Sequence, residues 1–230
     1  FEQHKNFAVG LKGVQRERTI SDAFEQSTSG KSLVNMMDLD LLVGSGGVLS
    51  HAPRREQSTK MLIDAFLPEG ITQLAVDSIF MMPQLGVLAN VTDADFSDEA
   101  KKAALEVFQK DCLIRLGTCI APVGSAKDGE VVIEAEFTLS DGSVLNKTLL
   151  KNELTRIEVP YEPVTAKITP SKKMDIGSGD GQELTSTIYG GEVGIILDGR
   201  NRPIEIPNDQ GLRLDLLKKW SNAINEYPKV

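Results

Sequence analysis

The chain has 230 residues, of which 40% are hydrophobic and 25% charged, a balance that excludes a disordered, collagenous or coiled-coil chain. Its 25 Lys and Arg residues against 33 Asp and Glu give a net charge of -8, which argues against nucleic acid as a partner because that role needs a basic face. No apolar run approaches the ~20 residues that span a bilayer and no leader peptide is visible, so we expect no membrane partner. Two cysteines without a disulfide scaffold favour a cytoplasmic location.

Two regions of different character are expected, the first covering residues 1–110. Strands are predicted at residues 40–43 and 74–76. One helix is predicted after the capping residue Ser50, with Gly70 as its stop. Further helices are predicted at residues 85–91 and from the capping residue Ser97 onward. This alternation of strands and helices is typical of an α/β domain.

The second region covers residues 111–230 and is dominated by apolar residues at every second position. A half-buried strand is predicted from Val131 to Leu139, and Asp141-Gly142 then predicts a hairpin turn. So many short strands favour a small barrel or sandwich, followed by a C-terminal amphipathic helix with Leu212 and Trp220 inward. The further strands are expected at residues 144–150, 156–159, 164–168, 184–189, 193–197 and 204–206.

The most informative stretch is a glycine-rich turn after the first strand, Gly44-Ser45-Gly46-Gly47. Glycines let a backbone approach a ligand closely, and the helix start that follows supplies free amides, so the turn is a candidate anion site. A tight turn without a ligand explains the same pattern. A Rossmann fingerprint does not fit because position 49 is Leu, and the Lys of a Walker A loop is missing. The spacing resembles the adenosine motif of actins, heat-shock chaperones and sugar kinases.

A narrower resemblance is carried by residues 38–55, which read Asp-Leu-Asp-Leu-Leu-Val-Gly-Ser-Gly-Gly-Val-Leu-Ser-His-Ala-Pro-Arg-Arg, and by residues 74–89. Both stretches are similar to the accessory ATPases of adenosylcobalamin-dependent aminomutases. These are the glutamate mutase L-type proteins and the reactivating factor of D-ornithine aminomutase. Residues 7–14 and 194–200 are also similar, so the resemblance covers the first ~100 residues well and the last ~40 loosely.

The resemblance implies that residues 1–110 are the C-terminal part of an actin-like (ribonuclease H-like) ATPase lobe, with residues 111–230 as an appended β-rich domain. It implies a chaperone-like reactivating factor that uses ATP to exchange damaged cobalamin on an aminomutase partner. Gly44, Ser45, Gly46 and Gly47 would then bind the nucleotide, ATP or ADP with Mg²⁺.

The family's phosphate loop and Mg²⁺ carboxylate lie upstream of the adenosine motif. Because this chain begins at Phe1, we expect a missing N-terminal part of the same protein to supply them, and we assign no catalytic residue to this chain. Whether the chain alone is an enzyme stays open. No Asp-x-His-x-x-Gly motif occurs, so we expect no cobalamin bound by this chain.

Two alternatives stay open. The turn could belong to an enzyme that binds a phosphate ester or pyridoxal phosphate, which predicts a lysine or carboxylate converging on it. It could also belong to a ligand-free interaction module, which predicts a turn packed over by side chains.

The remaining charged residues and the two cysteines are explained by structural roles. His51 is expected to make a local hydrogen bond, and Arg54 and Arg55 to lie on a solvated helix face. Asp77 is explained equally by helix capping and by a site role. Cys112 and Cys119 are expected to be buried thiols.

Three further features are expected to serve packing or turns. The loop at residues 175–181 is expected to hold no ligand, because Ser186 stands where a calcium loop needs Glu. Gly86 is expected to allow close helix packing. Phe80, Met81 and Met82 are expected in the core.

Overall fold

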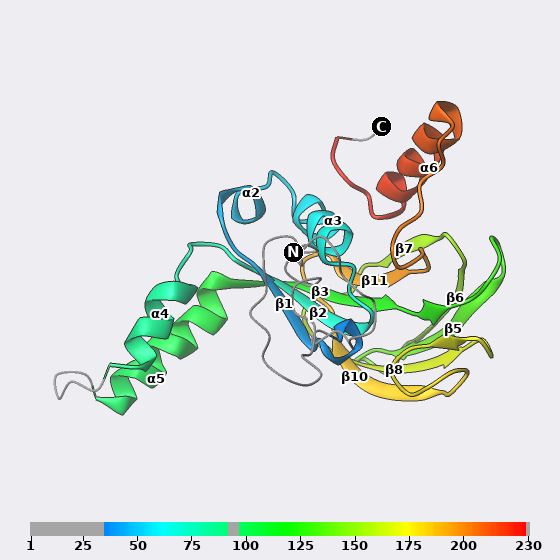
Figure 1. Cartoon of the computed structure of the whole chain (residues 1–230). Coiled ribbons are helices and arrows are strands. Elements are labelled where there is room, and N and C mark those ends of the chain that lie inside the picture. The colour runs from blue at the N-terminus through cyan, green and yellow to red at the C-terminus, as the bar shows by residue number, and fades with distance from the viewer. Residues whose placement is uncertain (1–34, 92–96, 229–230) are drawn as a thin grey trace, which may run out of the picture.

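A computed structural model of the chain describes residues 35–91 and 97–228 (Figure 1). Across these residues, one sheet has five strands in the order β1-β2-β3-β11-β7, and another has four strands in the order β10-β8-β5-β6. No helix within these two ranges is long and apolar enough to cross a membrane.

The five-stranded sheet is mixed, and its directions decide where the glycine turn lies. Strands β1 and β2 are parallel, so their carboxyl ends share one edge of the sheet. Strand β3 runs antiparallel to β2 and places Leu113 opposite Asp77 at that edge. Strand β11 is parallel to β3 and therefore ends at the opposite edge. The strands are β1 (Leu41–Gly44), β2 (Gly70–Asp77), β3 (Leu113–Ala121), β7 (Leu154–Ile157) and β11 (Gly194–Asp198).

The four-stranded sheet is antiparallel throughout. Its first hairpin turns at Asp141-Gly142, as the sequence predicts. A short pair, β4 and β9, forms a two-stranded sheet of its own. These strands are β4 (Val123–Gly124), β5 (Val131–Thr138), β6 (Val144–Leu150), β8 (Pro163–Pro170), β9 (Met174–Asp175) and β10 (Leu184–Tyr189).

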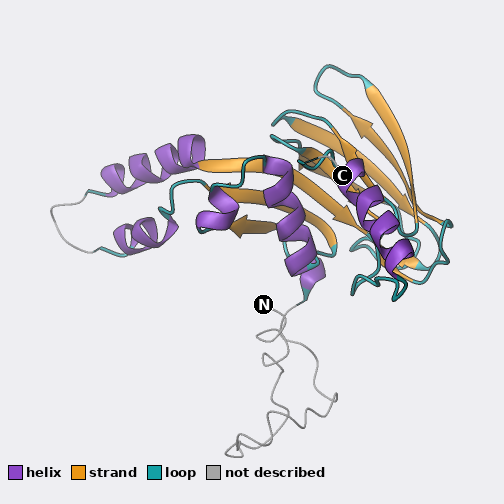
Figure 2. Cartoon of the chain, turned by 90° about the horizontal axis from the view of Figure 1, so that it is seen from above, coloured by secondary structure: helices purple, strands orange, loops and turns teal. Residues whose placement is uncertain are grey.

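Helices α3 and α6 pack against the five-stranded sheet, whereas α4 and α5 form a hairpin that extends away from it (Figures 1 and 2). The α-helices are α2 (Gly47–Ser50), α3 (Arg55–Phe66), α4 (Met82–Ala89), α5 (Asp98–Val107) and α6 (Gln210–Ala223). A 3-10 turn, η2 (Met36–Asp38), precedes β1, and a π-helical turn, η3 (Phe108–Cys112), connects α5 to β3.

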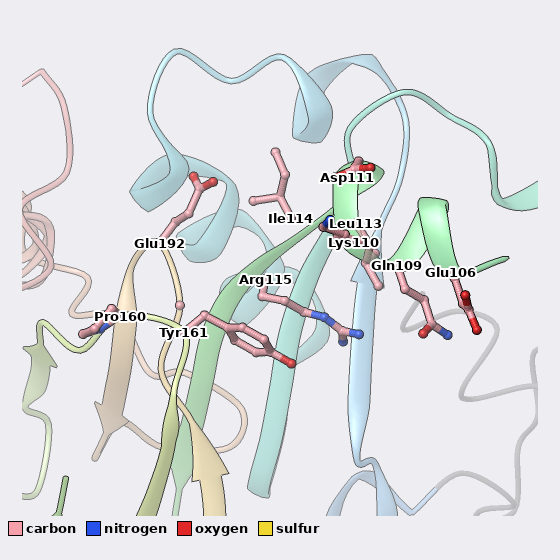
Figure 3. A pocket seen from close by; sticks show the side chains of 11 residues that line it. Glu106, Gln109, Lys110, Asp111, Leu113, Ile114, Arg115, Pro160, Tyr161 and Glu192 are labelled. Carbon is pink, nitrogen blue, oxygen red and sulfur yellow. The ribbon is translucent and has the colours of Figure 1, made fainter. Parts of the chain in front are cut away.

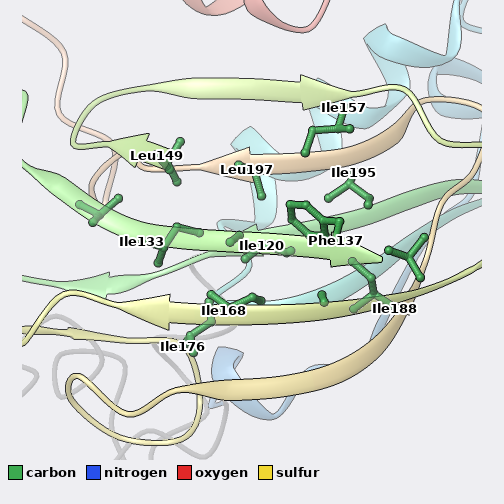
Figure 4. Packing of buried hydrophobic residues seen from close by; sticks show 14 of the residues in the cluster. Ile120, Ile133, Phe137, Leu149, Ile157, Ile168, Ile176, Ile188, Ile195 and Leu197 are labelled. Atoms are coloured by element: carbon green, nitrogen blue, oxygen red, sulfur yellow. The ribbon is translucent and has the colours of Figure 1, made fainter. Parts of the chain in front are cut away.

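The five-stranded sheet is buried on both faces, which makes it the centre of the fold. On one face it meets the four-stranded sheet, where Phe137 packs among isoleucines and leucines (Figure 4). On the other face Leu62 of α3 and Trp220 of α6 pack against it. Alternation along β11 serves both cores, since Ile195 faces the first and Ile196 the second.

Most predicted strands are confirmed, although β7 begins two residues before its predicted start and the short strands β4 and β9 were not predicted. Strand β3 was not predicted, although it is the longest strand of the central sheet. No strand forms at residues 204–206. Strand β5 carries a bulge near Val131, so Val131 is exposed while Val132 is buried.

The expected division at residues 110 and 111 does not separate two sheets. Strands β1 and β2 come from the first region, and β3, β7 and β11 from the second, yet all five share one hydrogen-bonded sheet. The two sheets pack face to face as a sandwich, but one of them is built by both regions. An actin-like lobe remains a prediction.

Several predicted local roles are wrong. Ser50 does not cap the helix that follows but is the last residue of α2. The left-handed residue that ends α3 is Leu67, and Gly70 instead opens β2. Leu212 is 63% exposed rather than inward, and Phe80 is 54% exposed rather than in the core, whereas Trp220 is buried as predicted.

Candidate functional site

The glycine turn follows β1 as the sequence predicts, but it leads into α2, a short helix at Gly47–Ser50 that was not predicted. Gly44 is buried, and a side chain there would meet Leu49 and Leu62 at 2.9 and 3.0 Å. This first glycine therefore serves packing between the sheet and the helices. Gly46 has φ of 101°, a backbone conformation that costs glycine little and other residues much.

The rest of the turn is open. A Cβ added to Gly46 or Gly47 would meet no atom of the described residues within 4 Å. The hydroxyl oxygen of Ser45 is buried and has no hydrogen-bond partner within the described part of the chain. An unsatisfied hydroxyl beside exposed backbone fits a ligand with polar groups, which would supply the missing bond.

Hydrogen bonds fix the turn to the sheet and to α3. The Ser50 hydroxyl donates to the backbone carbonyl of Asp77 over 2.6 Å, which joins α2 to the end of β2. The Ser58 hydroxyl of α3 donates to the carbonyl of Leu49 over 2.7 Å. The Arg55 guanidinium donates to the carbonyl of Ser50 over 3.0 Å. The turn is therefore held in place before any ligand arrives.

Asp77 is buried, and its carboxylate accepts backbone bonds rather than facing the turn. The amides of Ile79, Met81 and Met82 donate to it over 3.0–3.3 Å, which secures the start of α4. Burial raises the pKa of Asp77, but the bonds from Met82, Met81 and Ile79 outweigh it, so the pKa is lowered overall. Helix capping therefore explains Asp77.

A surface hollow of about 890 Å³ lies at the same edge of the sheet, where β3 begins (Figure 3). None of Gly44, Ser45, Gly46 and Gly47 lines it. The Arg115 side chain extends into it, close to Tyr161, and forms no ion pair with any described residue. Glu192 lines the hollow and pairs with Arg55 at 3.5 Å, which connects the hollow to the end of α2.

The other residues singled out in the sequence lie outside the glycine turn. His51 is exposed at the end of α2, and Arg54 stacks on the ring of Tyr227 at 5.4 Å. Arg55 is bonded to its neighbours rather than solvated. Gly86 is exposed with open space around it, so it does not serve close helix packing.

The thiols and the loop at residues 175–181 also have structural roles. Cys119 is buried, but Cys112 is only partly so. Asp175 closes its own loop by accepting from the amides of Gly177 and Gly179. Residues 35–91 and 97–228 contain no group of three or more His, Cys, Asp or Glu side chains that could hold a metal ion.

One charged cluster was missed by sequence reasoning. Asp198, at the end of β11, is fully buried and accepts from Arg200 over 2.8 Å and from Arg202 over 2.9 Å. Arg200 also pairs with Asp64 of α3 at 2.8 Å and lies over the Trp220 ring at 5.0 Å. The pattern Asp-x-Arg-x-Arg directly after an apolar strand could have signalled it.

Residues 5–112 match the family model described as MutL protein, the family of glutamate mutase accessory proteins. The match spans the glycine turn and every element from η2 to η3. No curated protein and no solved structure matches the chain. The resemblance to the glutamate mutase accessory proteins is thereby confirmed over residues 5–112. The likeness of residues 194–200 and the finer resemblance to the D-ornithine aminomutase factor stay predictions.

Proposed function

We propose that the chain acts as an accessory factor of an adenosylcobalamin-dependent aminomutase and contributes the adenosine side of a nucleotide site. The single observation that carries the proposal is the MutL family match over residues 5–112, within which the glycine turn lies. On this proposal ATP or ADP binds at the turn, and ATP turnover drives replacement of damaged cobalamin on the aminomutase.

The geometry of the turn supports nucleotide binding. Gly46 and Gly47 leave space for a ligand against the backbone, and Ser45 has a hydroxyl to donate. The phosphate and Mg²⁺ side of the site is proposed to come from another part of the protein.

The two alternatives have less support. The ligand-free module predicts a turn packed over, yet only Gly44 is packed, against Leu49 and Leu62. The enzyme that binds a phosphate ester or pyridoxal phosphate predicts a carboxylate or lysine at the turn. Asp77 is the carboxylate nearest in the sheet register, but its oxygens are occupied by backbone amides.

The decisive experiment compares nucleotide binding in two glycine variants of the whole protein. Gly46 and Gly142 both have positive φ, at 101° and 83°, and both have open space where a Cβ would stand. Gly46→Ala should weaken ADP and ATP binding about tenfold or more, because a methyl group and a shifted backbone then occupy the turn. Gly142→Ala carries the same kind of backbone penalty in a distant hairpin and should bind as the wild type does.

Isothermal titration with ADP and with ATP measures the nucleotide affinity of both variants. The second readout is the recovery of activity by a glutamate mutase that damaged cobalamin has inactivated. Equal nucleotide affinity in Gly46→Ala and wild type would place the nucleotide elsewhere. If the mutase recovered its activity without ATP, the proposal that ATP turnover drives the cobalamin exchange would be wrong.

A further inference from the structure

Lys151 stands out because its side chain is almost wholly buried while its ammonium has no partner among the described residues. It follows β6 in the turn that leads to β7, and it is only 6% exposed. Its backbone is fixed, since its amide donates to the carbonyl of Glu130 over 2.8 Å and its carbonyl accepts from the amide of Gly129. Its ammonium forms no hydrogen bond and no ion pair with any residue in the described ranges. A cation that is partly desolvated and has no partner is costly, so such groups are uncommon in purely structural positions.

The side chain lines a surface pocket of about 640 Å³. The pocket lies between the β6–β7 turn, the segment that leads into α6, and α6 itself. Its walls are part apolar and part polar, which is typical of small-molecule sites. Besides Lys151, the lining includes the acidic residues Asp128, Glu153 and Glu205.

The acidic residues of this pocket do not neutralise Lys151. The Asp128 carboxylate accepts from the side-chain amide of Asn152 over 2.6 Å. The Glu153 carboxylate accepts from the backbone amide of Leu150 over 3.2 Å. Glu205 is exposed and forms no ion pair with Lys151. The lining therefore contains a mostly buried lysine whose ammonium donors are not used by any described residue.

The electrostatics agree with this geometry. Burial lowers the pKa of Lys151, and the nearby Arg202 lowers it further, while Glu205, Asp128 and Asp198 oppose the change. The Arg202 guanidinium is itself held by Asp198 at 2.9 Å, so it does not compete for a ligand. An anion placed beside the ammonium would relieve its desolvation and complete its hydrogen bonds.

We propose that this pocket is a binding site for a small anion, the phosphate or carboxylate group of a ligand, held by the Lys151 ammonium. The site is independent of the proposed nucleotide turn. The backbone amide of Asn152, beside Lys151, donates to the carbonyl of Gly199, just after β11 ends at the opposite edge of the sheet from Gly44. A result that disproves nucleotide binding at the turn would therefore leave anion binding in this pocket untouched, and the reverse also holds.

The test uses the whole chain with inorganic phosphate and with acetate as separate probes. Lys151→Met keeps the apolar stem and removes the ammonium, and Lys218→Met on the exposed surface of α6 is the matched control. Isothermal titration should show phosphate or acetate binding to the wild type and to Lys218→Met. Lys151→Met should bind the same anion about tenfold more weakly or worse, because one charged hydrogen bond is lost.

A second readout does not depend on how well the variant folds. In wild-type protein labelled with ¹³C at lysine Cε, the Lys151 signal should titrate at a higher pH with the bound anion present than without it. Phosphate binding alone or acetate binding alone supports the proposal and identifies which oxyanion the site prefers. Equal affinity in Lys151→Met and wild type, or no effect of either anion on the Lys151 titration, overturns it.

Discussion

At the scale of single residues, the two thiols show how depth in the fold sets reactivity. Cys119 lies within β3 and is fully buried, whereas Cys112, just before that strand, is partly exposed. Burial raises the pKa of Cys119 to about 12, because its thiolate would be desolvated and would also face Asp198. The thiolate is the reactive form, so Cys119 is protected both by burial and by its protonation state.

We therefore expect one thiol to react with Ellman's reagent at pH 8 in the folded protein and two after denaturation. Cys112→Ser should abolish the reaction of the folded protein, and Cys119→Ser should leave it unchanged. Measurement of released thionitrobenzoate gives both counts. Fast reaction of the Cys112→Ser protein would show that β3 opens readily.

At the scale of elements, the α4–α5 hairpin differs from the rest of the molecule in having little tertiary packing. Helix α5 contains no buried residue, and within the described ranges a small cluster that includes Leu85, Phe108 and Leu113 joins the hairpin to the sheet. The helix begins at a cap where the Ser97 hydroxyl accepts from the amide of Ala100 over 3.2 Å. With so little tertiary packing, local interactions such as this cap carry much of the helix's stability.

Ser97→Ala should therefore destabilise α5 locally by about 1 kcal/mol, the usual cost of a lost cap. Amide hydrogen exchange should accelerate in α5 but not in β2 or β11. The thermal midpoint of the whole protein should hardly change, because opening the hairpin leaves both main cores intact. Accelerated exchange throughout the central sheet would mean that the hairpin unfolds together with it.

At the scale of the whole molecule, Asp198 joins elements that are far apart in sequence. Through Arg200 it connects β11 to Asp64 of α3, and Arg200 also contacts Trp220 of α6. Burial raises the pKa of Asp198, but the charges and hydrogen bonds of Arg202 and Arg200 outweigh it and lower the pKa to about 2. Removal of Asp198 would leave two buried guanidinium groups without their shared partner.

Asp198→Asn should lower the free energy of unfolding by about 3–5 kcal/mol, the usual cost of breaking a buried ion pair on one side. Urea unfolding at pH 7 measures it, with the exposed Asp215→Asn on α6 as the control. A loss below about 1 kcal/mol would show that Arg200 and Arg202 find other partners.

The same carboxylate predicts an acid dependence. Its pKa is lower in the folded chain than the ~3.9 of an unfolded aspartate, so its stabilisation is present above about pH 4. That stabilisation is lost as the pH falls from about 4 towards 2, where the folded group takes up its proton. Urea midpoints should therefore fall over this range more in wild type than in Asp198→Asn.

The sequence predicted most of the local structure. The strand before the glycine turn, the Ser97 cap and the Asp141-Gly142 hairpin follow from patterns of a few neighbouring residues. Strand β3 was missed because it is buried on both faces and carries Arg115, Gly117 and Thr118, so no alternation marks it. The Lys151 pocket was missed because its residues come from segments that are distant in the chain.

What the sequence by itself determined is the glycine turn, its strand and the likeness to the aminomutase accessory proteins, since these depend on contiguous residues. Only the tertiary structure decided that β1 and β2 share a sheet with β3, β7 and β11, and that Lys151 and Asp198 are buried. The physical reason is that strand pairing and the desolvation of a charge depend on which distant segments pack together, and no local pattern records that choice.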